Sequence, residues 1–447
     1  MNRKPKWSVL LMLALLISML VPSGAVAQDE EIVIEFWNWW GVQREPLMNE
    51  IIADFNQDHP NVTIKNLVQG WDRRAEMVLT AMAGGDPPEV MMASRAELVR
   101  FAAEGLIVPI TQYVEEAGID LDAYYPSEIA TMWWDGELYS LPMPTAGGET
   151  SLYVYNKTMF EEAGLDPENP PTTWQELWEV SAVLNKRADD GSIELMAIDI
   201  GTGGVSFLAW LYTNNGKLYS DDLRTVTINS PEGVETLQWM IDYIDEFYGG
   251  IENHADFLAL SSGESGEFPF FQRRQAMWLN NVSVFGHIAT FAPDMDYGVA
   301  LRPHNGDNPD AESHGIAPVS FGWGYVIPKG LDPAVERAAF EWVKQITYEI
   351  ERTGACWFMQ QQARPSPLKE CNEDPIFYEI NPAWDNVKRA LESDVALPVV
   401  PPQSRILEII TQYVDLALYG EMSPQEALDA AAEEAQAVLD EYWASVQ

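Results

Sequence analysis

The sequence predicts an α/β protein of more than one lobe, built on a mainly parallel sheet with helices on both faces. Near the N-terminus, short apolar segments rich in β-formers alternate three times with amphipathic helical segments. This alternation is typical of a parallel sheet built from βα units. The chain that follows the leader has about 420 residues, which exceeds what one hydrophobic core usually supports, so two or three lobes are expected.

Residues 1–27 are predicted to be a cleaved signal peptide. Basic residues precede an apolar run over 9–21, and Ala25-Val26-Ala27 supplies the small-residue pattern that signal peptidase needs. A membrane anchor is the alternative, but the run is shorter than the roughly 20 residues that span a bilayer. No cysteine follows the cleavage pattern. We therefore expect a periplasmic or extracellular protein that is not lipid-anchored.

The first lobe is expected to open with three strands and three helices. The strands are short apolar runs, and the helices carry apolar residues three to four positions apart. The predicted strands are 31–37, 62–67 and 89–93. The predicted helices are 44–56, 73–83 and 96–103.

The rest of the chain mixes strands with longer helices. Thr173 and Glu176 form a predicted capping box for a helix that begins at Trp174. Strands are predicted at 136–142, 151–156, 297–302 and 324–327. Further helices are predicted at 158–163, 207–212, 231–247, 271–277, 333–346, 404–419 and 424–443.

The charge balance is strongly acidic, with a net charge of −43. Such a surface repels phosphate backbones and anionic headgroups, so nucleic acid and acidic substrates are poor candidates for partners. The acids are scattered along the chain, which favours a solvated surface over one acidic tail.

The two cysteines, Cys356 and Cys371, predict a disulfide in an exported protein. Closing a loop of this length contributes about 3 kcal/mol in the chain-entropy model. Two buried free thiols are the alternative. No histidines stand beside the cysteines, so a zinc site is not expected.

Catalytic signatures are absent from the sequence. The five histidines do not fall in metal-ligand spacing, and no nucleophile elbow, Walker A loop or dinucleotide fingerprint occurs. Adjacent acids such as Glu115-Glu116 could suggest a glycosidase, but such pairs are expected by chance among 69 acids. We therefore expect no enzyme activity, no cofactor and no metal.

Aromatic residues are abundant, with 17 Trp, 17 Tyr and 16 Phe. Several stand beside predicted strands: Trp40 and Trp71 follow strands, and Trp323 leads into one. Ligands of open α/β sheets bind beyond the carboxyl ends of the strands. A flat aromatic face there suits a pyranose ring, and it also suits a quaternary ammonium ion. Core packing is the alternative, and it is favoured for Trp239 and Trp342, which lie within predicted helices.

Several segments, in this order, carry a family resemblance. Residues 152–163 (LYVYNKTMFEEA), with PPTTW at 170–174, are the most specific, and AGGDPPEV at 83–90 and GWGYVIP at 322–328 add to them. Nearly all of the chain after the leader resembles the extracellular solute-binding proteins of family 1. These are the sugar receptors of ABC importers, and they include maltose-binding proteins.

The resemblance implies a two-lobe periplasmic-binding-protein fold of type II, with three crossings between lobes. The N-terminal lobe would comprise 28–142 and 301–347, and the C-terminal lobe 143–300 and 348–447. It also implies a monomeric receptor without catalysis, which closes by a hinge on a mono- or oligosaccharide and delivers it to membrane permease subunits. The alternative ligand is a cation or polyol, such as a betaine or polyamine.

The resemblance also points to ligand-binding residues. Trp40 and Gln43, with Arg44 beside them, follow the first strand, and Glu149 precedes the 152–156 strand as an acidic sugar ligand does in maltose-binding members. An acid here would accept hydrogen bonds from sugar hydroxyls, and arginines would donate to sugar oxygens. The other expected contacts are Trp71, Asp72, Arg95, Asn281, Trp323 and Arg364.

Overall fold

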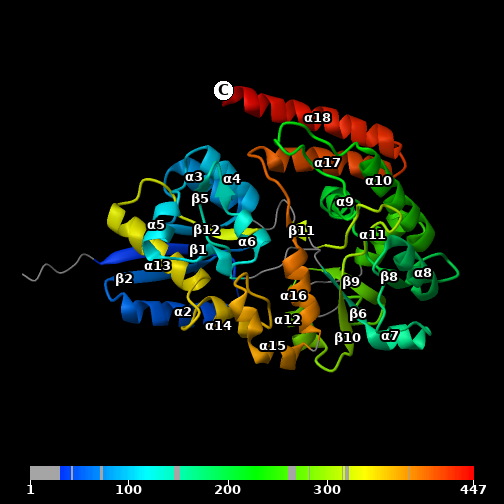
Figure 1. Cartoon of the computed structure of the whole chain (residues 1–447), viewed down its shortest axis with the longest axis horizontal. Helices are drawn as coiled ribbons and strands as arrows, with labels where there is room; N and C mark the ends of the chain where they lie inside the picture. Colours follow the sequence, from blue (N-terminus) through cyan, green and yellow to red (C-terminus); the bar gives the residue numbers. More distant parts are fainter. Residues whose placement is uncertain are drawn as a thin grey trace, which may run out of the picture.

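A computed structural model describes residues 31–41, 44–70, 74–144, 152–259, 268–280, 282–314, 316–317, 322–381 and 383–446. The predicted signal peptide lies outside them. The chain forms two α/β lobes that lie side by side, each around its own sheet (Figure 1). None of the helices in these described ranges is long and apolar enough to cross a membrane.

The first sheet has the strand order β12-β3-β1-β2. Its strands are β1 (Ile32–Asn38), β2 (Val62–Val68), β3 (Val90–Ser94) and β12 (Trp323–Val326). β1 runs parallel to β2 and β3, as the βα alternation predicts, whereas β12 pairs antiparallel with β3. Every residue of β3 is buried, which explains why its sequence is a continuous apolar run.

Helices cover this sheet through apolar stripes. α2 buries Met48, Ile51 and Phe55 at helical spacing, and Phe55 meets Trp342 of α13 with ring centroids 5.3 Å apart. Trp342 is therefore a core residue, as expected. The helices of this lobe are α2 (Glu45–Asp58), α3 (Arg74–Gly84), α4 (Arg95–Ala103), α5 (Thr111–Ala117), α6 (Pro126–Ala130) and α13 (Pro333–Thr347). A 3-10 turn spans Leu121–Ala123.

The second sheet has the order β10-β6-β9-β8-β7. Its strands are β6 (Leu152–Asn156), β7 (Lys186–Arg187), β8 (Ile193–Ile198), β9 (Gln275–Asn280) and β10 (Tyr297–Leu301). The helix predicted at 271–277 is wrong, because residues 271–274 form a turn and β9 begins at Gln275 and lies between β6 and β8. Pairing with strands far away in the sequence overrides the local helical pattern there.

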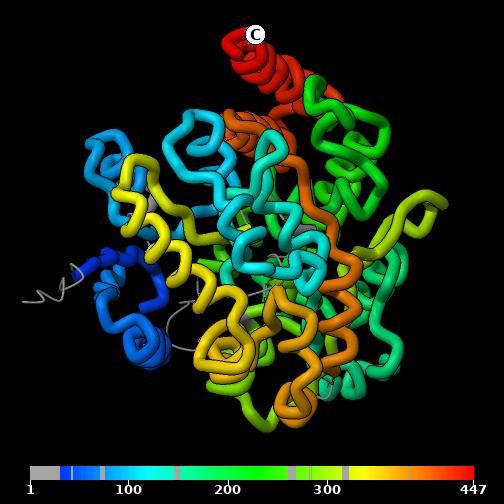
Figure 2. The backbone as a smooth tube through the Cα atoms, turned by 60° about the vertical axis from the view of Figure 1, so that its left-hand side comes forward, coloured from blue at the N-terminus to red at the C-terminus, as the bar shows by residue number. Residues whose placement is uncertain are grey.

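Helices surround the second sheet as well. Thr173 caps α8 with Glu176 in the predicted capping box. The helices are α7 (Lys157–Glu162), α8 (Trp174–Leu184), α9 (Gly203–Tyr212), α10 (Pro231–Tyr243), α11 (Ile251–Ala259), α12 (Ser283–Phe291), α15 (Pro375–Ile380), α16 (Trp384–Ser393), α17 (Gln403–Leu418) and α18 (Pro424–Ser445). A π turn, Ile244–Tyr248, follows α10. In both views the red helix α18 lies at one end of the molecule, over α17 (Figure 2).

Short elements complete the fold. The strand predicted at 136–142 is largely wrong, because only β5 (Glu137–Leu138) is extended there, as half of a tight hairpin with β4 (Trp133–Trp134). A second small pair joins β11 (Ile316–Ala317) to β13 (Val395–Ala396).

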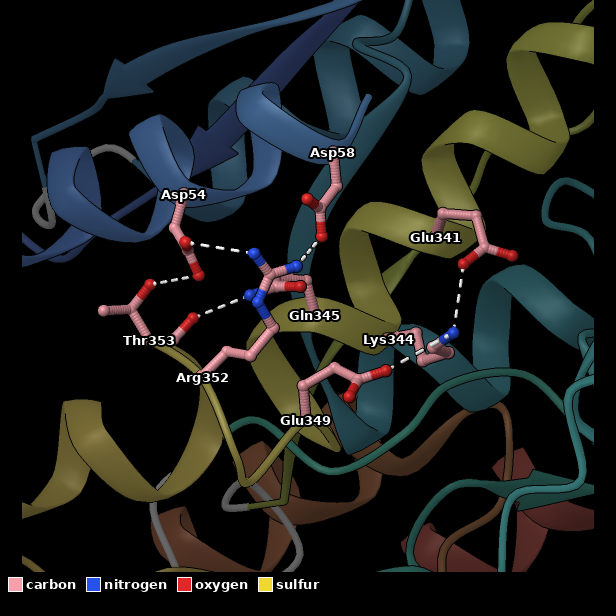
Figure 3. Close-up of polar contacts among 8 residues, drawn as sticks. All are labelled: Asp54, Asp58, Glu341, Lys344, Gln345, Glu349, Arg352 and Thr353. Carbon is pink, nitrogen blue, oxygen red and sulfur yellow. Dashed lines mark hydrogen bonds and ion pairs between the residues drawn. The ribbon is translucent and has the colours of Figure 1, made fainter. Parts of the chain in front are cut away.

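The segment after α13 is fastened to the first lobe. Arg352 pairs with Asp54 and Asp58 of α2, and the hydroxyl of Thr353 donates to Asp54 at 2.8 Å (Figure 3). The side-chain amide of Gln345 donates to the carbonyl of Thr353 at 2.7 Å. These contacts fix where the next helix, α14 (Ala355–Gln360), begins.

A disulfide links α14 to the 3-10 turn that follows it in the chain. Cys356 and Cys371 are bonded, with their Cα atoms 5.0 Å apart, which confirms the predicted pair. Cys371 lies in a 3-10 turn, Glu370–Glu373. Near it, the backbone N–H of Tyr125 donates to the carbonyl of Pro367 at 2.9 Å. The exact lobe boundaries stay a prediction, since residues 352–369 contact the first lobe and α15 and α16 pack on the second sheet.

Candidate functional site

The carboxyl ends of the first sheet bring predicted site residues together. β1 ends at Asn38 and β3 at Ser94, and Trp323 pairs with Ser94 at the start of β12. Trp40, Arg95 and Trp323 therefore lie along one edge of this sheet. That edge is where open α/β sheets bind ligands.

Trp40 lies at this edge, where hydrogen bonds and aromatic packing hold its side chain. Its backbone N–H donates to the Asn38 side chain at 2.8 Å, and its indole N–H donates to the Tyr325 hydroxyl at 3.1 Å. Phe358 of α14 meets the ring edge-on at 5.2 Å. Trp40 is only 3% exposed, so little of its ring is available for stacking on a sugar in this conformation.

Two guanidinium groups lie against the Trp40 ring. The Arg44 Cζ is 4.9 Å from the ring centroid, and the Arg364 Cζ is 5.8 Å from it. Burial lowers the pKa of Arg44; burial and then the charge of Arg44 lower the pKa of Arg364 to about 9. Within the described part of the chain, neither guanidinium has a carboxylate at ion-pairing distance.

His287 of α12 approaches from the second lobe. Its ring stacks on Phe268 at 5.3 Å, and its buried Nδ1 has no hydrogen-bond partner among the residues that the structure describes. Burial lowers its pKa, and the charges of Arg364 and Arg44 lower it further. The imidazole is therefore neutral at neutral pH and has a nitrogen available for a ligand.

Arg95 has a different setting. Its Nη1 donates to the carbonyl of Leu397, and burial lowers its pKa to about 10. Its Nε has no hydrogen-bond partner in the described ranges. Arg95 thus joins the first lobe to the segment that precedes α17.

Trp323 is half-buried, and because side chains alternate along a strand it shares a sheet face with Tyr325. Trp323 therefore lies on the same side of the sheet as Trp40. The remaining predicted contacts, Gln43, Trp71, Asp72, Glu149 and Asn281, lie outside the described residues.

Sequence reasoning missed His287 and Tyr325. The signal for Tyr325 was present, because it lies two residues after Trp323 on a predicted strand and so shares its face. No local signal marks His287, since it reaches the site only through the packing of α12 on the second sheet.

Residues of α8 and α10 line an aromatic hollow. These two helices lie at the outer side of the second lobe (Figure 1). The volume of the hollow is about 290 Å³. Trp174 and Trp239 line it and stack on each other at 4.4 Å, and Trp239 also packs on Trp210. These tryptophans pack chiefly against one another, as expected for Trp239.

No described group of three or more His, Cys, Asp and Glu side chains is arranged to hold a metal ion. The groups at the sheet edge that could contact a ligand are instead the Trp40 indole, the guanidinium groups of Arg44 and Arg364, and the imidazole of His287. This set can hold a polar ligand through hydrogen bonds.

Comparison with known proteins gives consistent matches. Residues 40–346 match the model of the family described as bacterial extracellular solute-binding protein. The sn-glycerol-3-phosphate-binding periplasmic protein UgpB of Pectobacterium atrosepticum is 23% identical over 441 residues, covering 94% of this chain and 93% of its own.

Two solved structures are similar over almost their whole length. The substrate-binding protein Lmo0181 of Listeria monocytogenes, in complex with cycloalternan, is 18% identical with a TM-score of 0.75, covering 92% of this chain and all of its own. The sugar-binding protein MalE of Xanthomonas citri is 20% identical with a TM-score of 0.74, covering 93% and 99%. At these identities the likeness shows the fold, a two-lobe periplasmic-binding-protein fold of type II.

Proposed function

Since the chain belongs to the family of bacterial extracellular solute-binding proteins, we propose that it is the receptor of an ABC importer and binds a mono- or oligosaccharide between its lobes. The solute-binding role follows from the family. The single observation that carries the proposed ligand is the meeting of Trp40, Trp323 and Arg364 at the carboxyl edge of the first sheet. The half-buried indole of Trp323, beside guanidinium donors, suits a sugar, which has C–H faces and a rim of hydroxyls.

A cationic solute, such as a betaine or polyamine, is the weaker candidate. Arg44 and Arg364 stand on the ring that would otherwise receive a cation, and their charges would repel it. The described part of the edge thus favours a ligand rich in acceptors and hydroxyls.

The receptor would work by closing its lobes around the ligand, so that permease subunits distinguish the closed from the open form. We propose that it acts as an exported monomer without a lipid anchor and without catalysis. Recovering the bound sugar unchanged after prolonged incubation would support binding without turnover, whereas a hydrolysed product would contradict it.

The test is calorimetric titration of the folded protein against neutral sugars. The panel includes mannobiose, maltotriose and tagatose, which structural relatives bind. It also includes sn-glycerol 3-phosphate, for which the sequence relatives are named, and glycine betaine and spermidine as the cationic arm. Binding of a hydroxylated solute, with none of the cations, is the expected result. Binding of a cation alone would overturn the proposal.

A further inference from the structure

The strongest unexplained feature of the molecule is a group of positive and neutral nitrogen donors in a protein of net charge −43. Arg44, Arg364 and His287 come from three separate parts of the chain. Arg44 stands at the start of α2, Arg364 follows α14, and His287 lies on α12. α12 packs closely on the loop that carries Arg364, because a Cβ atom on Gly286 would lie 3.3 Å from the carbonyl oxygen of Gln362. Although the protein is rich in acids, none of the described acids lies at ion-pairing distance from these donors.

Placing two such positive charges close together lowers the stability of the fold unless a negative charge offsets their repulsion. Arg44 and Arg364 approach one indole closely enough that the charge of Arg44 lowers the pKa of Arg364. Two half-buried cations that repel each other destabilise a fold unless an anion offsets them. Among the described residues, no carboxylate does so. The missing counter-charge is what a bound anion would supply.

The backbone also holds Arg364 in place. Ala363, just before it, has φ +53°, a left-handed conformation that is unfavourable for a residue with a side chain. The backbone N–H of Arg364 donates to the carbonyl of Met359 at 3.1 Å, and the disulfide closes the surrounding loop. Unfavourable backbone geometry that the surroundings enforce is found at ligand sites.

The three donors also span both lobes. Arg44 belongs to a helix that packs on the first sheet, and α12 packs on the second. Arg44 and Arg364 face the neutral imidazole of His287, which comes from the second lobe. An anionic group between them would accept hydrogen bonds from each side and favour the closed form.

We propose that Arg44, Arg364 and His287 form a subsite for an anionic group, a phosphate or a carboxylate, carried by a hydroxylated ligand held between the lobes. This inference rests on the proposed function, because it assigns a charge to the same ligand. It also replaces the expectation, drawn from net charge, that acidic solutes are poor ligands. The local field of these donors, and not the distant surface acids, acts on a group in contact with them.

The test compares ligands in matched pairs by calorimetry at neutral pH. Glucose is paired with glucose 6-phosphate and with glucuronate, and glycerol with sn-glycerol 3-phosphate. The charged member is expected to bind at least about tenfold more tightly than its neutral parent, and only its affinity should fall as salt is added. The phosphate and carboxylate arms tell the two anions apart.

Arg364→Gln is expected to lower the affinity for the charged member by a factor at least about tenfold larger than its effect on the neutral parent, because Gln keeps an N–H donor for hydroxyls and loses the charge. Arg364→Lys should retain part of the preference, since it keeps the charge and loses the fork geometry. Arg100→Gln is the matched control, because Arg100 is exposed on α4 and pairs with Glu104 at 2.9 Å. Circular dichroism confirms that each variant is folded.

The outcomes separate the two proposals. If a neutral sugar binds as tightly as its charged partner in the unaltered protein, the anion subsite is wrong and the receptor function stands. If inorganic phosphate binds but no hydroxylated solute of either kind does, the subsite stands and the proposed ligand class is wrong. An equal loss for both members of a pair in Arg364→Gln would also overturn the subsite.

Discussion

Among the places where an ionisable group lies against an aromatic ring, two are built differently. In the second lobe, His254 stacks on Tyr248 at 4.8 Å, and its Nε2 meets the carboxylate of Asp199 at 2.8 Å. At the first sheet, Arg44 and Arg364 lie against Trp40 with no described carboxylate. The first arrangement is complete within the described residues, whereas the second has no counter-charge among them.

The difference shows how a contact between a charged group and an aromatic ring that serves the fold can be told from one that serves ligand binding. A pair that satisfies itself stabilises the fold and has nothing left to offer a ligand. Donors that have no carboxylate partner among the described residues can still bind an acceptor on a ligand. Variants in each place should therefore separate stability from binding.

The largest effect is expected from removing the disulfide with Cys356→Ser and Cys371→Ser together. Releasing this loop should lower the free energy of unfolding by about 3 kcal/mol, because the unfolded chain regains entropy. Affinity should also fall, since the loop carries Arg364. Urea unfolding and calorimetry measure the two losses. Full affinity in the folded variant would mean that Arg364 is positioned without the disulfide.

Asp199→Asn should affect stability alone, by about 1.5–3 kcal/mol, the range for hydrogen bonds to charged groups. Burial by itself would raise the pKa of Asp199, but hydrogen bonds from His254 and Gly201 outweigh it, so that the pKa is lowered. A lowered folded pKa gives stability above the unfolded value of about 3.9 that is lost as pH falls through the folded pKa.

The deficit of Asp199→Asn should therefore be full at neutral pH and shrink in acid below about pH 4. Chemical unfolding at several pH values measures it. Ligand affinity should not change in the folded variant, and a large loss of affinity would break the distinction between the two places.

Trp323→Ala is expected to lower ligand affinity at least about tenfold, or about 1.4 kcal/mol, with the fold intact. Trp239→Ala is the matched control, because Trp239 packs on Trp174 and Trp210 away from the sheet edge. The control should lose stability and keep its affinity. Equal affinity for Trp323→Ala and the unaltered protein would remove Trp323 from the site.

Local pattern was sufficient to predict much of the fold. The strand β3 of the first sheet is an apolar run because it is buried along its whole length, and the long helices α13, α17 and α18 have clear apolar stripes. The segment 271–277 misled because β9 draws its stability from strands more than 70 residues away in the chain, which a local window does not contain.

The candidate site was predictable in part. The rule that ligands bind at strand ends correctly brings Trp40 and Trp323 to one edge. The closeness of Arg44 and Arg364 was not predictable, because it depends on a covalently closed loop and on one left-handed residue, Ala363. Net charge could not predict this closeness either, since it says nothing about which few charges are placed together.

The disulfide also bears on when the receptor can bind. Thiols stay reduced in the cytoplasm and pair in oxidising compartments. If the closed loop is what aims Arg364, a newly made chain with free Cys356 and Cys371 has weak affinity. It would then pass the cytoplasmic pool of metabolites without capturing them, and would gain its full affinity only after export, on the side of the membrane where the nutrient is scarce.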